Sequence, residues 1–213
     1  KERCLVFASL DHSGGQGTSA YHQQPLWAPS RVPEVNSREV PKWMEQADID
    51  EVIEGFVLAA RVAVSSRCDG VEINAGQHSL VRQFLSGLTN HRDDPWGQDK
   101  TLFARTIIEK VRDAIGDAVI GLRLSCDELA PWAGITPDMA VELAPQLAAC
   151  GLDYLVVVRG SIFSVEKTRP DFHEPEGFNT DITQRIQAVL NIPVFLQGSV
   201  VQPLMAMSAV EHG

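Results

Sequence analysis

The feature that most constrains the fold of this 213-residue chain is a regular alternation of two kinds of segment. Short runs rich in β-branched residues alternate with longer segments that repeat apolar residues at helical spacing. This alternation is typical of parallel βα units, in which a helix carries the chain back to the start of the next strand. Five strands are predicted, at residues 5–10, 71–74, 119–124, 154–158 and 193–196.

Helices are predicted between these strands, at residues 49–64, 80–85, 102–114, 138–149 and 182–189, with a last helix that begins at Pro203. Asp48 is the expected N-cap of the first helix, and Gly116 is expected to end the third. A Gly-, Pro- and Gln-rich excursion occupies residues 13–41, and residues 161–179 form a polar loop. The fourth strand, YLVVV, is apolar throughout, which predicts burial on both faces.

Five consecutive βα units fit two architectures equally well, a doubly wound sheet and most of a (β/α)₈ barrel. A complete barrel of eight units typically takes about 250 residues. With only five units in 213 residues, the barrel interpretation predicts an α/β fold that is an incomplete TIM barrel. The chain begins with Lys1, and we expect it to be cut from a longer protein.

Composition narrows the range of partners. The chain has 18 Lys plus Arg against 28 Asp plus Glu, a formal net charge of -10, which disfavours nucleic acid and anionic lipid as partners. No apolar run approaches the roughly 20 residues that span a bilayer. The four cysteines are far apart and are predicted to be reduced, mostly buried thiols of a cytoplasmic protein.

No metal site or nucleotide-binding loop is predicted. The histidines in loops or at the terminus lack metal-ligand spacing and are expected to be solvated: His22, His91, His173 and His212. The end of the first strand matches neither the phosphate-binding P-loop nor a complete dinucleotide fingerprint.

The densest polar cluster follows the second strand. Asn74 and Gln77 offer amide N–H groups that do not titrate, so together they are candidates to hold a carbonyl or carboxylate oxygen. The alternative is that both amides cap the helix that follows. His78 is either a proton donor near neutral pH or a hydrogen-bonded surface histidine.

Two further positions are candidates for binding an anionic group. Arg123 lies inside an apolar strand, where a guanidinium is costly unless it meets an anion or an electron-rich ring. The alternative is a buried ion pair, with Glu72 as the candidate partner. Gly198, after the last strand, would let the backbone approach a phosphate closely, although an ordinary tight turn is the more common explanation.

Several blocks of sequence, in conserved order, resemble the old yellow enzyme group of FMN-dependent oxidoreductases, in particular the branch of 2,4-dienoyl-CoA reductase and trimethylamine dehydrogenase. The resemblance spans almost the whole chain. The blocks are residues 6–14 (VFASLDHSG), 28–30 (APS) with 32–33 (VP), 69–73 (DGVEI), 83–86 (QFLS) followed by Asn90, Arg92, Asp94 and Gly97, and 121–125 (GLRLS).

The resemblance implies a TIM barrel, one partial FMN-binding domain over residues 1–213, that contains strands three to seven. It implies that Arg123, Gly198 and Ser9 contact FMN, and that NADH or NADPH supplies a hydride. It also implies that Asn74 and Gln77 grip the carbonyl of an enone-like small molecule. Iron–sulfur ligands of longer relatives would lie beyond Gly213, and a homo-oligomer is compatible with the family.

The chain departs from the family pattern at five positions. Asn74 and Gln77 replace the His-x-x-His or His-x-x-Asn clamp, as in a subset associated with mycofactocin clusters. Ser79 stands where the family often has its proton-donating tyrosine, Ser9 where it has a glutamine, and Gly15 where it has an arginine. The alternative functions are therefore a degenerate, non-catalytic barrel fragment and, less favoured, a barrel lyase or aldolase without a redox cofactor.

Overall fold

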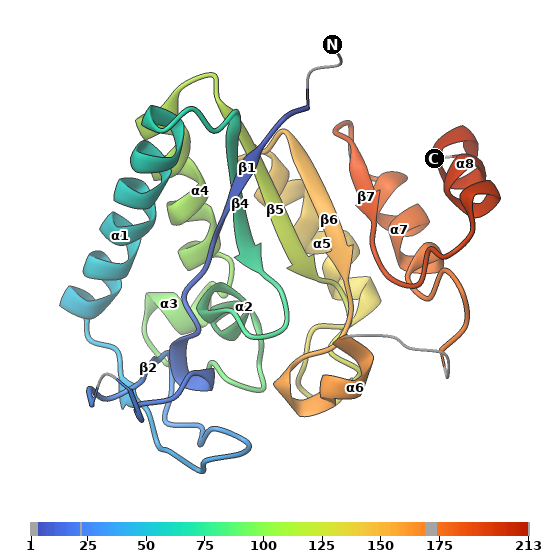
Figure 1. Ribbon diagram of the computed structural model, residues 1–213. Coiled ribbons are helices and arrows are strands. Elements are labelled where there is room, and N and C mark those ends of the chain that lie inside the picture. Colours follow the sequence, from blue (N-terminus) through green and yellow to red (C-terminus); the bar gives the residue numbers. More distant parts are fainter. Residues whose placement is uncertain (1–3, 22, 169–173, 213) are drawn as a thin grey trace.

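The computed structural model describes residues 4–21, 23–168 and 174–212, and its centre is one five-stranded parallel sheet (Figure 1). The strands lie in the order β1-β4-β5-β6-β7, which is also their order in the chain. Their bounds are Phe7–Leu10, Gly70–Ala75, Val119–Ser125, Tyr154–Val158 and Val194–Leu196. A doubly wound sheet reverses its strand order at a switch point, whereas this sheet advances in one direction throughout. The winding is therefore that of a TIM barrel, and the five strands do not close it.

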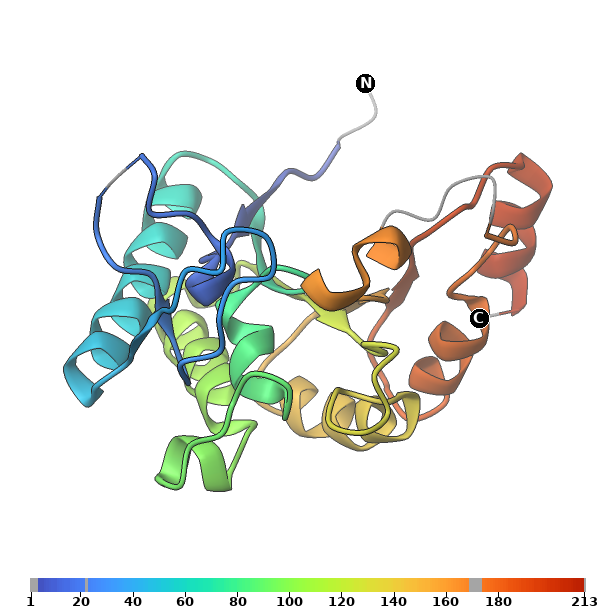
Figure 2. The same cartoon turned by 90° about the horizontal axis from the view of Figure 1, so that it is seen from below.

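Four helices cover one face of this sheet, namely α1 (Gln46–Ser65), α4 (Leu102–Ile115), α5 (Pro137–Ala148) and α7 (Thr180–Gln187). Figures 1 and 2 show these helices along the outer side of a curved sheet, with the inner, concave face turned away from them. The main hydrophobic core lies between this layer of helices and the strands. All five residues of β6 are buried, as its apolar sequence predicts.

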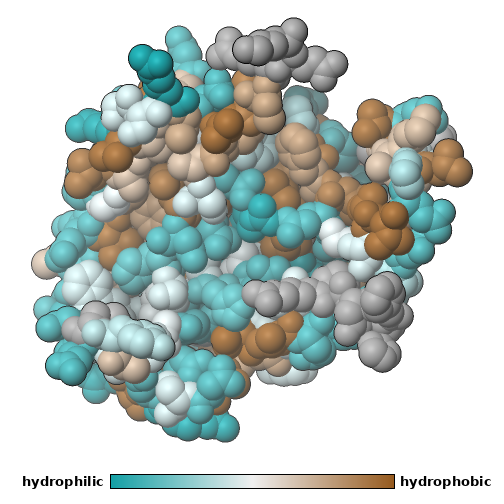
Figure 3. All heavy atoms as spheres, viewed as in Figure 1, coloured by the Kyte–Doolittle hydropathy of each residue, from teal (hydrophilic) through white to brown (hydrophobic). Residues whose placement is uncertain are grey.

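The concave face carries a second, smaller cluster of apolar side chains. Tyr154, Val156 and Val158 of β6 form this cluster, and Phe7 and Val119 pack against it. Because successive side chains of a strand point to opposite faces, the intervening residues of β6 belong to the main core. In Figure 3, apolar side chains also gather at the surface over β7 and over α8 (Pro203–His212).

Of the two helix ends predicted from the sequence, one is confirmed and one is wrong. Gly116 ends α4 with a φ of 60°, as glycine at a helix C-terminus should. Asp48, however, is not the N-cap of α1. Glu45 occupies that position, and Asp48 lies three residues later, where its carboxylate accepts the Glu45 N–H at 2.8 Å. This reciprocal arrangement is a capping box, so the helix starts one turn earlier than predicted.

The segments expected to be irregular contain short elements. The excursion holds the 3₁₀ turn η1 (Gly14–Gln16) and the strand β2 (Trp27–Ala28), which pairs in parallel with β3 (Lys42–Trp43). The polar loop after β6 holds η2 (Ile162–Ser164) and α6 (Val165–Thr168). Two short helices follow β4, α2 (Leu80–Leu85) and α3 (Pro95–Gln98).

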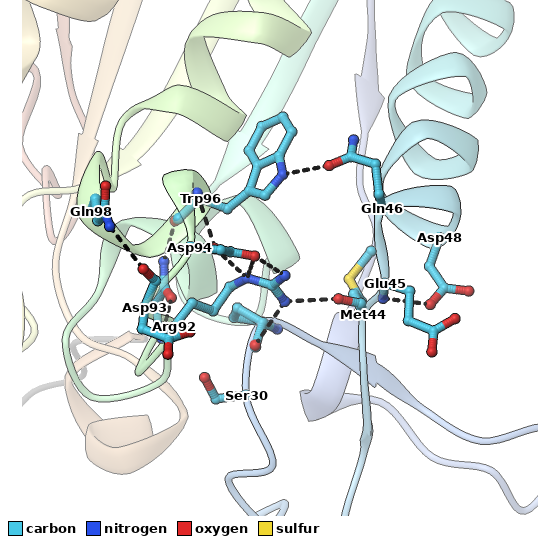
Figure 4. A network of polar contacts seen from close by, with 12 residues as sticks. Ser30, Met44, Glu45, Gln46, Asp48, Arg92, Asp93, Asp94, Trp96 and Gln98 are labelled. Atoms are coloured by element: carbon cyan, nitrogen blue, oxygen red, sulfur yellow. Dashed lines mark hydrogen bonds and ion pairs between the residues drawn. The ribbon is translucent and has the colours of Figure 1, made fainter.

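Arg92 joins the loop before α3 to the excursion (Figure 4). Its guanidinium donates to the Pro29 carbonyl at 3.2 Å and the Met44 carbonyl at 2.8 Å, and lies 4.0 Å from the centre of the Trp43 ring. Asp94 completes the set as its ion-pair partner. The block of Asn90, Arg92, Asp94 and Gly97, part of the resemblance above, is thus a structural clamp.

The cysteines correct one expectation. All four are free thiols, but only Cys126 is buried, while Cys4 is exposed and Cys68 and Cys150 are half-buried. Burial raises the pKa of the Cys126 thiol, which keeps it neutral. None of the helices in the described ranges is long and apolar enough to cross a membrane.

Candidate functional site

The candidate site lies at the carboxyl ends of the central strands, because parallel strands that advance in one direction all end at the same edge. The register between strands arranges the concave side chains in two rows. Ser9, Glu72, Gly121 and Tyr154 are cross-strand neighbours in the lower row. The upper row, nearer the carboxyl ends, contains Asn74, Arg123, Val156 and Phe195. The chain thus brings Asn74 and Arg123 side by side.

Arg123 contacts both a carboxylate below it and a polar side chain above it. Its Nε and Nη2 each lie 2.8 Å from Oε1 of Glu72, and Nη1 donates to Oε1 of Gln197, just after β7. The ion pair with Glu72, one of the two alternatives for Arg123, is therefore present. It does not bury the guanidinium, since the Arg123 side chain keeps 27 % of its surface exposed.

Glu72 is shared between Arg123 and Tyr154. The Tyr154 hydroxyl donates to Oε2 of Glu72 at 3.1 Å, and burial together with this carboxylate raises the pKa of Tyr154. Gly121 makes the contact feasible, because a Cβ at that position would lie 2.0 Å from the Tyr154 ring. The glycine therefore lets the ring cross β5 and reach β4.

Asn74 is held in one orientation by its neighbours. Its Oδ1 accepts the Gly76 N–H at 2.8 Å, and its side chain faces the Asp11 carboxyl, whose pKa it acts to lower. Gln77 lies on the same loop and donates through Nε2 to the Arg159 carbonyl at 3.4 Å, which links the ends of β4 and β6.

The cap of α2 is Ser79, so the alternative that Asn74 and Gln77 cap this helix is wrong. The Ser79 hydroxyl accepts the Val81 N–H at 3.0 Å and donates to the Asn74 carbonyl. Ser79 is fully buried. A hydroxyl engaged on both sides and withdrawn from the surface does not replace the tyrosine that the family often has at this position.

Sequence reasoning missed Asp11 and His12, which follow β1 directly. Partial burial raises the pKa of Asp11 and lowers that of His12. His12 accepts the Gly14 N–H on Nδ1 at 3.0 Å, which identifies a neutral ring with its proton on Nε2. The sequence signal that could have found Asp11 is the alternation of side chains along β1. Phe7 and Ser9 point to the concave face, so residue 11 is the next position that does.

The loop after β7 brings Gly198 to the same edge. Gly198 has a φ of 119°, a conformation that favours glycine. The loop is held by the Asn179 side-chain amide, which donates to the Gln197 carbonyl at 2.5 Å, and by the Gly177 N–H, which donates to the Ser199 carbonyl at 3.0 Å. In the described part of the chain, no acceptor takes the Gly198 N–H.

Ser9 and His91, two of the remaining sequence candidates, are exposed. Ser9 lies on β1, and His91 bonds the Gly87 carbonyl at 3.0 Å through Nε2. His22, His173 and the side chain of His212 lie outside the described residues. Within the described ranges, no cluster of three or more His, Cys, Asp or Glu side chains is arranged to hold a metal ion.

Comparison with known proteins decides the family. Residues 1–213 match the NADH:flavin oxidoreductase / NADH oxidase family over their whole length. The chain belongs to this family. Membership confirms the recognition from sequence and the cofactor class predicted with it, FMN with a reduced nicotinamide as hydride donor.

Individual relatives agree with this assignment. The chain is 30 % identical to an NADH oxidase of Thermoanaerobacter brockii over 98 % of its own length and 33 % of the relative's. It is 32 % identical to a probable N-methylproline demethylase of Rhizobium meliloti, covering 89 % of this chain and 29 % of that protein. It superposes on histamine dehydrogenase from Rhizobium sp. 4-9 with a TM-score of 0.88 at 24 % identity, over 98 % of this chain and 31 % of that one. The chain thus spans about a third of the length of these relatives.

Proposed function

We propose that this chain is the flavin-binding part of an FMN-dependent oxidoreductase that passes a hydride from NADH or NADPH to a small carbonyl-bearing molecule. The observation that carries the proposal is the partly exposed side chain of Arg123 at the carboxyl edge of a TIM-barrel sheet, in a chain of this family. A guanidinium has five N–H donors, and three of them suffice for the contacts with Glu72 and Gln197. The donors that remain suit an electron-rich ring edge.

The other groups at this edge fit FMN as well. Gly198 offers a backbone N–H without an acceptor in the described ranges, and such a group suits a phosphate oxygen. Ser9 adds a short hydroxyl on the concave side of β1, where the family usually has a longer glutamine. When bound, FMN would take a hydride from the nicotinamide and pass it on. Arg123 would then stabilise the negative charge on the reduced ring.

Asn74 and Gln77 are the proposed ligands of the substrate. Both are neutral amides, so they would donate hydrogen bonds to a carbonyl oxygen at any pH at which the protein is folded. Donors aimed at that oxygen stabilise the negative charge that develops on it when hydride adds to a conjugated carbon. This assigns an enone-like substrate to the site. Because one relative is named for demethylating N-methylproline and one solved structure is of a histamine dehydrogenase, a substrate panel should include tertiary and primary amines.

The test is flavin affinity in the protein of natural length. We expect Arg123→Ala to weaken FMN binding by about 10- to 150-fold, the equivalent of one lost hydrogen bond to a charged group. Arg185→Ala is the matched control, since Arg185 forms an exposed ion pair with Asp138 between the outer helices α7 and α5. Titration of flavin fluorescence measures the affinity, and circular dichroism checks the fold. Unchanged FMN affinity in a folded Arg123→Ala protein contradicts the proposal.

A non-catalytic relative is the second candidate, and the burial of Ser79 favours it. With the hydroxyl at the tyrosine position engaged in capping α2, the usual proton donor is missing. The absorbance spectrum of the purified protein separates the two candidates. A flavin band that bleaches on addition of NADH or NADPH supports the oxidoreductase, whereas a protein without bound flavin supports the degenerate relative.

A further inference from the structure

Asp11 carries a carboxyl group at the candidate site that the proposed function leaves without a role. It follows β1 directly, and the register of β1 with β4 pairs Leu10 with Ile73, so the next pair is Asp11 with Asn74. Phe7 packs against the Tyr154 ring on the concave face, with ring centres 5.5 Å apart, while Leu10 belongs to the core under the helices. The alternation along the strand therefore turns Asp11 to the concave side.

Asn74 and Asp11 face each other at the ends of β4 and β1, and Asn74 acts to lower the pKa of the Asp11 carboxyl. Since the Asn74 Oδ1 accepts the Gly76 N–H, the end of the amide that faces Asp11 is the NH₂ group. The Asp11 carboxyl therefore lies beside the N–H donors proposed to hold the substrate oxygen. A carbonyl compound held by these donors would place its α-carbon beside the Asp11 carboxyl.

Asp11 differs from the other carboxyl groups at this edge in its partners. Glu72 is paired with Arg123, and Asp127 lies 3.6 Å from Nε of Arg159. Among the described residues, no lysine or arginine pairs with Asp11; the titratable groups that face it are His12 and His78. Asp11 is also an exposed residue, so it can exchange protons with water.

We propose that Asp11 is a catalytic acid that protonates the substrate carbon in place of the missing tyrosine. The proposal rests on the proposed function, which supplies the two electrons as a hydride from reduced FMN to the β-carbon of the conjugated carbonyl compound. The O–H bond of the Asp11 carboxyl breaks, a C–H bond forms at the α-carbon, and the enolate becomes the ketone. The carboxylate then takes a proton from solvent, so the net reaction consumes one hydride from the nicotinamide and one solvent proton.

The ionisation of Asp11 supports this role. Partial burial raises its pKa, against the opposing effects of the hydrogen bonds and of the two histidines. A carboxyl whose pKa moves towards neutrality retains a larger fraction of its acid form at working pH, which is the property that general acid catalysis requires.

The test compares Asp11→Asn with wild type in the flavin-loaded protein of natural length. Reduction of cyclohexenone should fall by about 10²- to 10⁴-fold, the usual contribution of a positioned acid. Reduction of the flavin by NADH or NADPH, and its reoxidation by ferricyanide, should not change, because neither step protonates carbon. Asp50→Asn is the matched control, since Asp50 is an exposed carboxylate on α1 that bonds Gln46.

A second measurement needs no turnover. In the protein without flavin, the Asp11 carboxyl carbon should titrate in the NMR spectrum above the pKa of about 3.9 of free aspartate. The Asn74 side-chain NH₂ signals should shift with the same midpoint in wild type and lose this shift in Asp11→Asn. A purely structural aspartate in an ion pair would titrate below the free value.

Three outcomes overturn the proposal, and they are distinguishable. Full cyclohexenone reduction by Asp11→Asn, or titration of Asp11 at or below the free value, refutes the role of Asp11 and leaves the flavin function intact. Wild-type flavin that nicotinamide reduces but no activated alkene reoxidises refutes the acid role and the enone substrate together. A protein that binds no FMN refutes both proposals.

Discussion

At the scale of single residues, the ion pair between Arg123 and Glu72 explains how a charged strand position is tolerated in the absence of flavin. Each oxygen of Glu72 has a partner, Arg123 on one side and the Tyr154 hydroxyl on the other. A buried carboxylate satisfied in this way avoids most of the cost of desolvation. The ion pair and the binding of an electron-rich ring, the two alternatives for Arg123, are thus compatible. One guanidinium pairs with Glu72 below it and keeps N–H donors for the open edge above it.

The first prediction concerns Gly121. An added methyl group would lie 2.0 Å from the Tyr154 ring, so Gly121→Ala must displace the ring and weaken its bond to Glu72. We expect a loss of about 1–3 kcal/mol of unfolding free energy, the usual cost of overpacking. Urea denaturation measures it. Gly55→Ala is the control, since nothing lies within 4 Å of that position in α1 and alanine favours helix. Equal stability of the two variants would contradict this account of Gly121.

The residues that sequence reasoning found and missed differ in one physical respect. Arg123 was found because a charged residue inside an apolar strand stands out in the sequence itself. Recognising it needs no knowledge of which residues lie nearby in space. Asp11 was missed because a polar residue after a strand is ordinary. Its importance comes from Asn74, more than sixty residues away in the chain and adjacent only through strand register. Ser79 was noticed as a departure from the family, but its role as a helix cap required the structure.

At the scale of elements, α2 is the part that ties the carboxyl edge together. Gln83 accepts the Gly15 N–H at 3.0 Å and donates to the Ser13 carbonyl at 2.8 Å, which fixes η1 against the helix. Arg82, from the same helix, forms a fully buried ion pair with Glu128 in the loop after β5. One short helix thus positions the loops after two strands.

The second prediction tests the buried pair of Arg82 and Glu128. Removing one partner leaves the other as an uncompensated charge, so Glu128→Ala should lower the unfolding free energy by about 3–5 kcal/mol. The double variant Arg82→Met with Glu128→Leu removes both charges and should recover most of that loss. Thermal or urea unfolding of the three proteins measures the difference. A double variant as unstable as the single one would show that the pair contributes more than charge compensation.

The third prediction is a pH dependence of the clamp around Arg92. The hydrogen bond from Arg92 is the main reason why the pKa of Asp94 is lowered. A carboxyl with a lowered folded-state pKa stabilises the protein above its unfolded pKa of about 3.9, and this stabilisation is lost as the pH falls through the folded value. Asp94→Asn should keep the cap on the Trp96 N–H but lack the charge. The stability difference between wild type and Asp94→Asn should therefore be largest near neutral pH.

Denaturation curves at a series of pH values measure this difference. Lys110→Ala is a suitable control for general charge effects, because Lys110 and Glu54 form an exposed pair between α4 and α1. The difference between wild type and Lys110→Ala should stay small throughout. A gap between wild type and Asp94→Asn that widens as the solution is acidified would contradict the role given to the Arg92 clamp.

Elements were predictable from sequence where local signals sufficed. All five strands and the long helices were expected close to their observed positions. Their apolar residues repeat at the spacing of a strand or a helix, because one or both faces of each element are buried. The start of α1 was misplaced, since both Glu45 and Asp48 suit a helix start and only the backbone decides between them. The short elements β2 and β3 escaped prediction because each has two residues, and the pairing that defines them is not local.

At the scale of the whole molecule, the order of the strands decides the architecture that periodicity left open. Each crossover moves the chain one position in the same direction, so polar residues from all five strand ends gather at one edge. The same winding leaves β1 and β7 as outer strands of the described sheet, each paired on one side only. Parallel barrels normally close and thereby remove such edges.

The last prediction follows from these edges and from the apolar surface beside them. On β7, Phe195 is 53 % exposed, and on α8 Leu204 and Val210 are 74 % and 85 % exposed. We expect the 213-residue chain, purified alone, to self-associate at micromolar concentration and to bind a hydrophobic dye. The net charge of -10 opposes association by repulsion, so added salt should strengthen it by screening. Sedimentation velocity at low and high salt measures both effects. A dye-negative monomer at every salt concentration would mean that five strands of this barrel are self-sufficient, and that neither edge requires a partner strand.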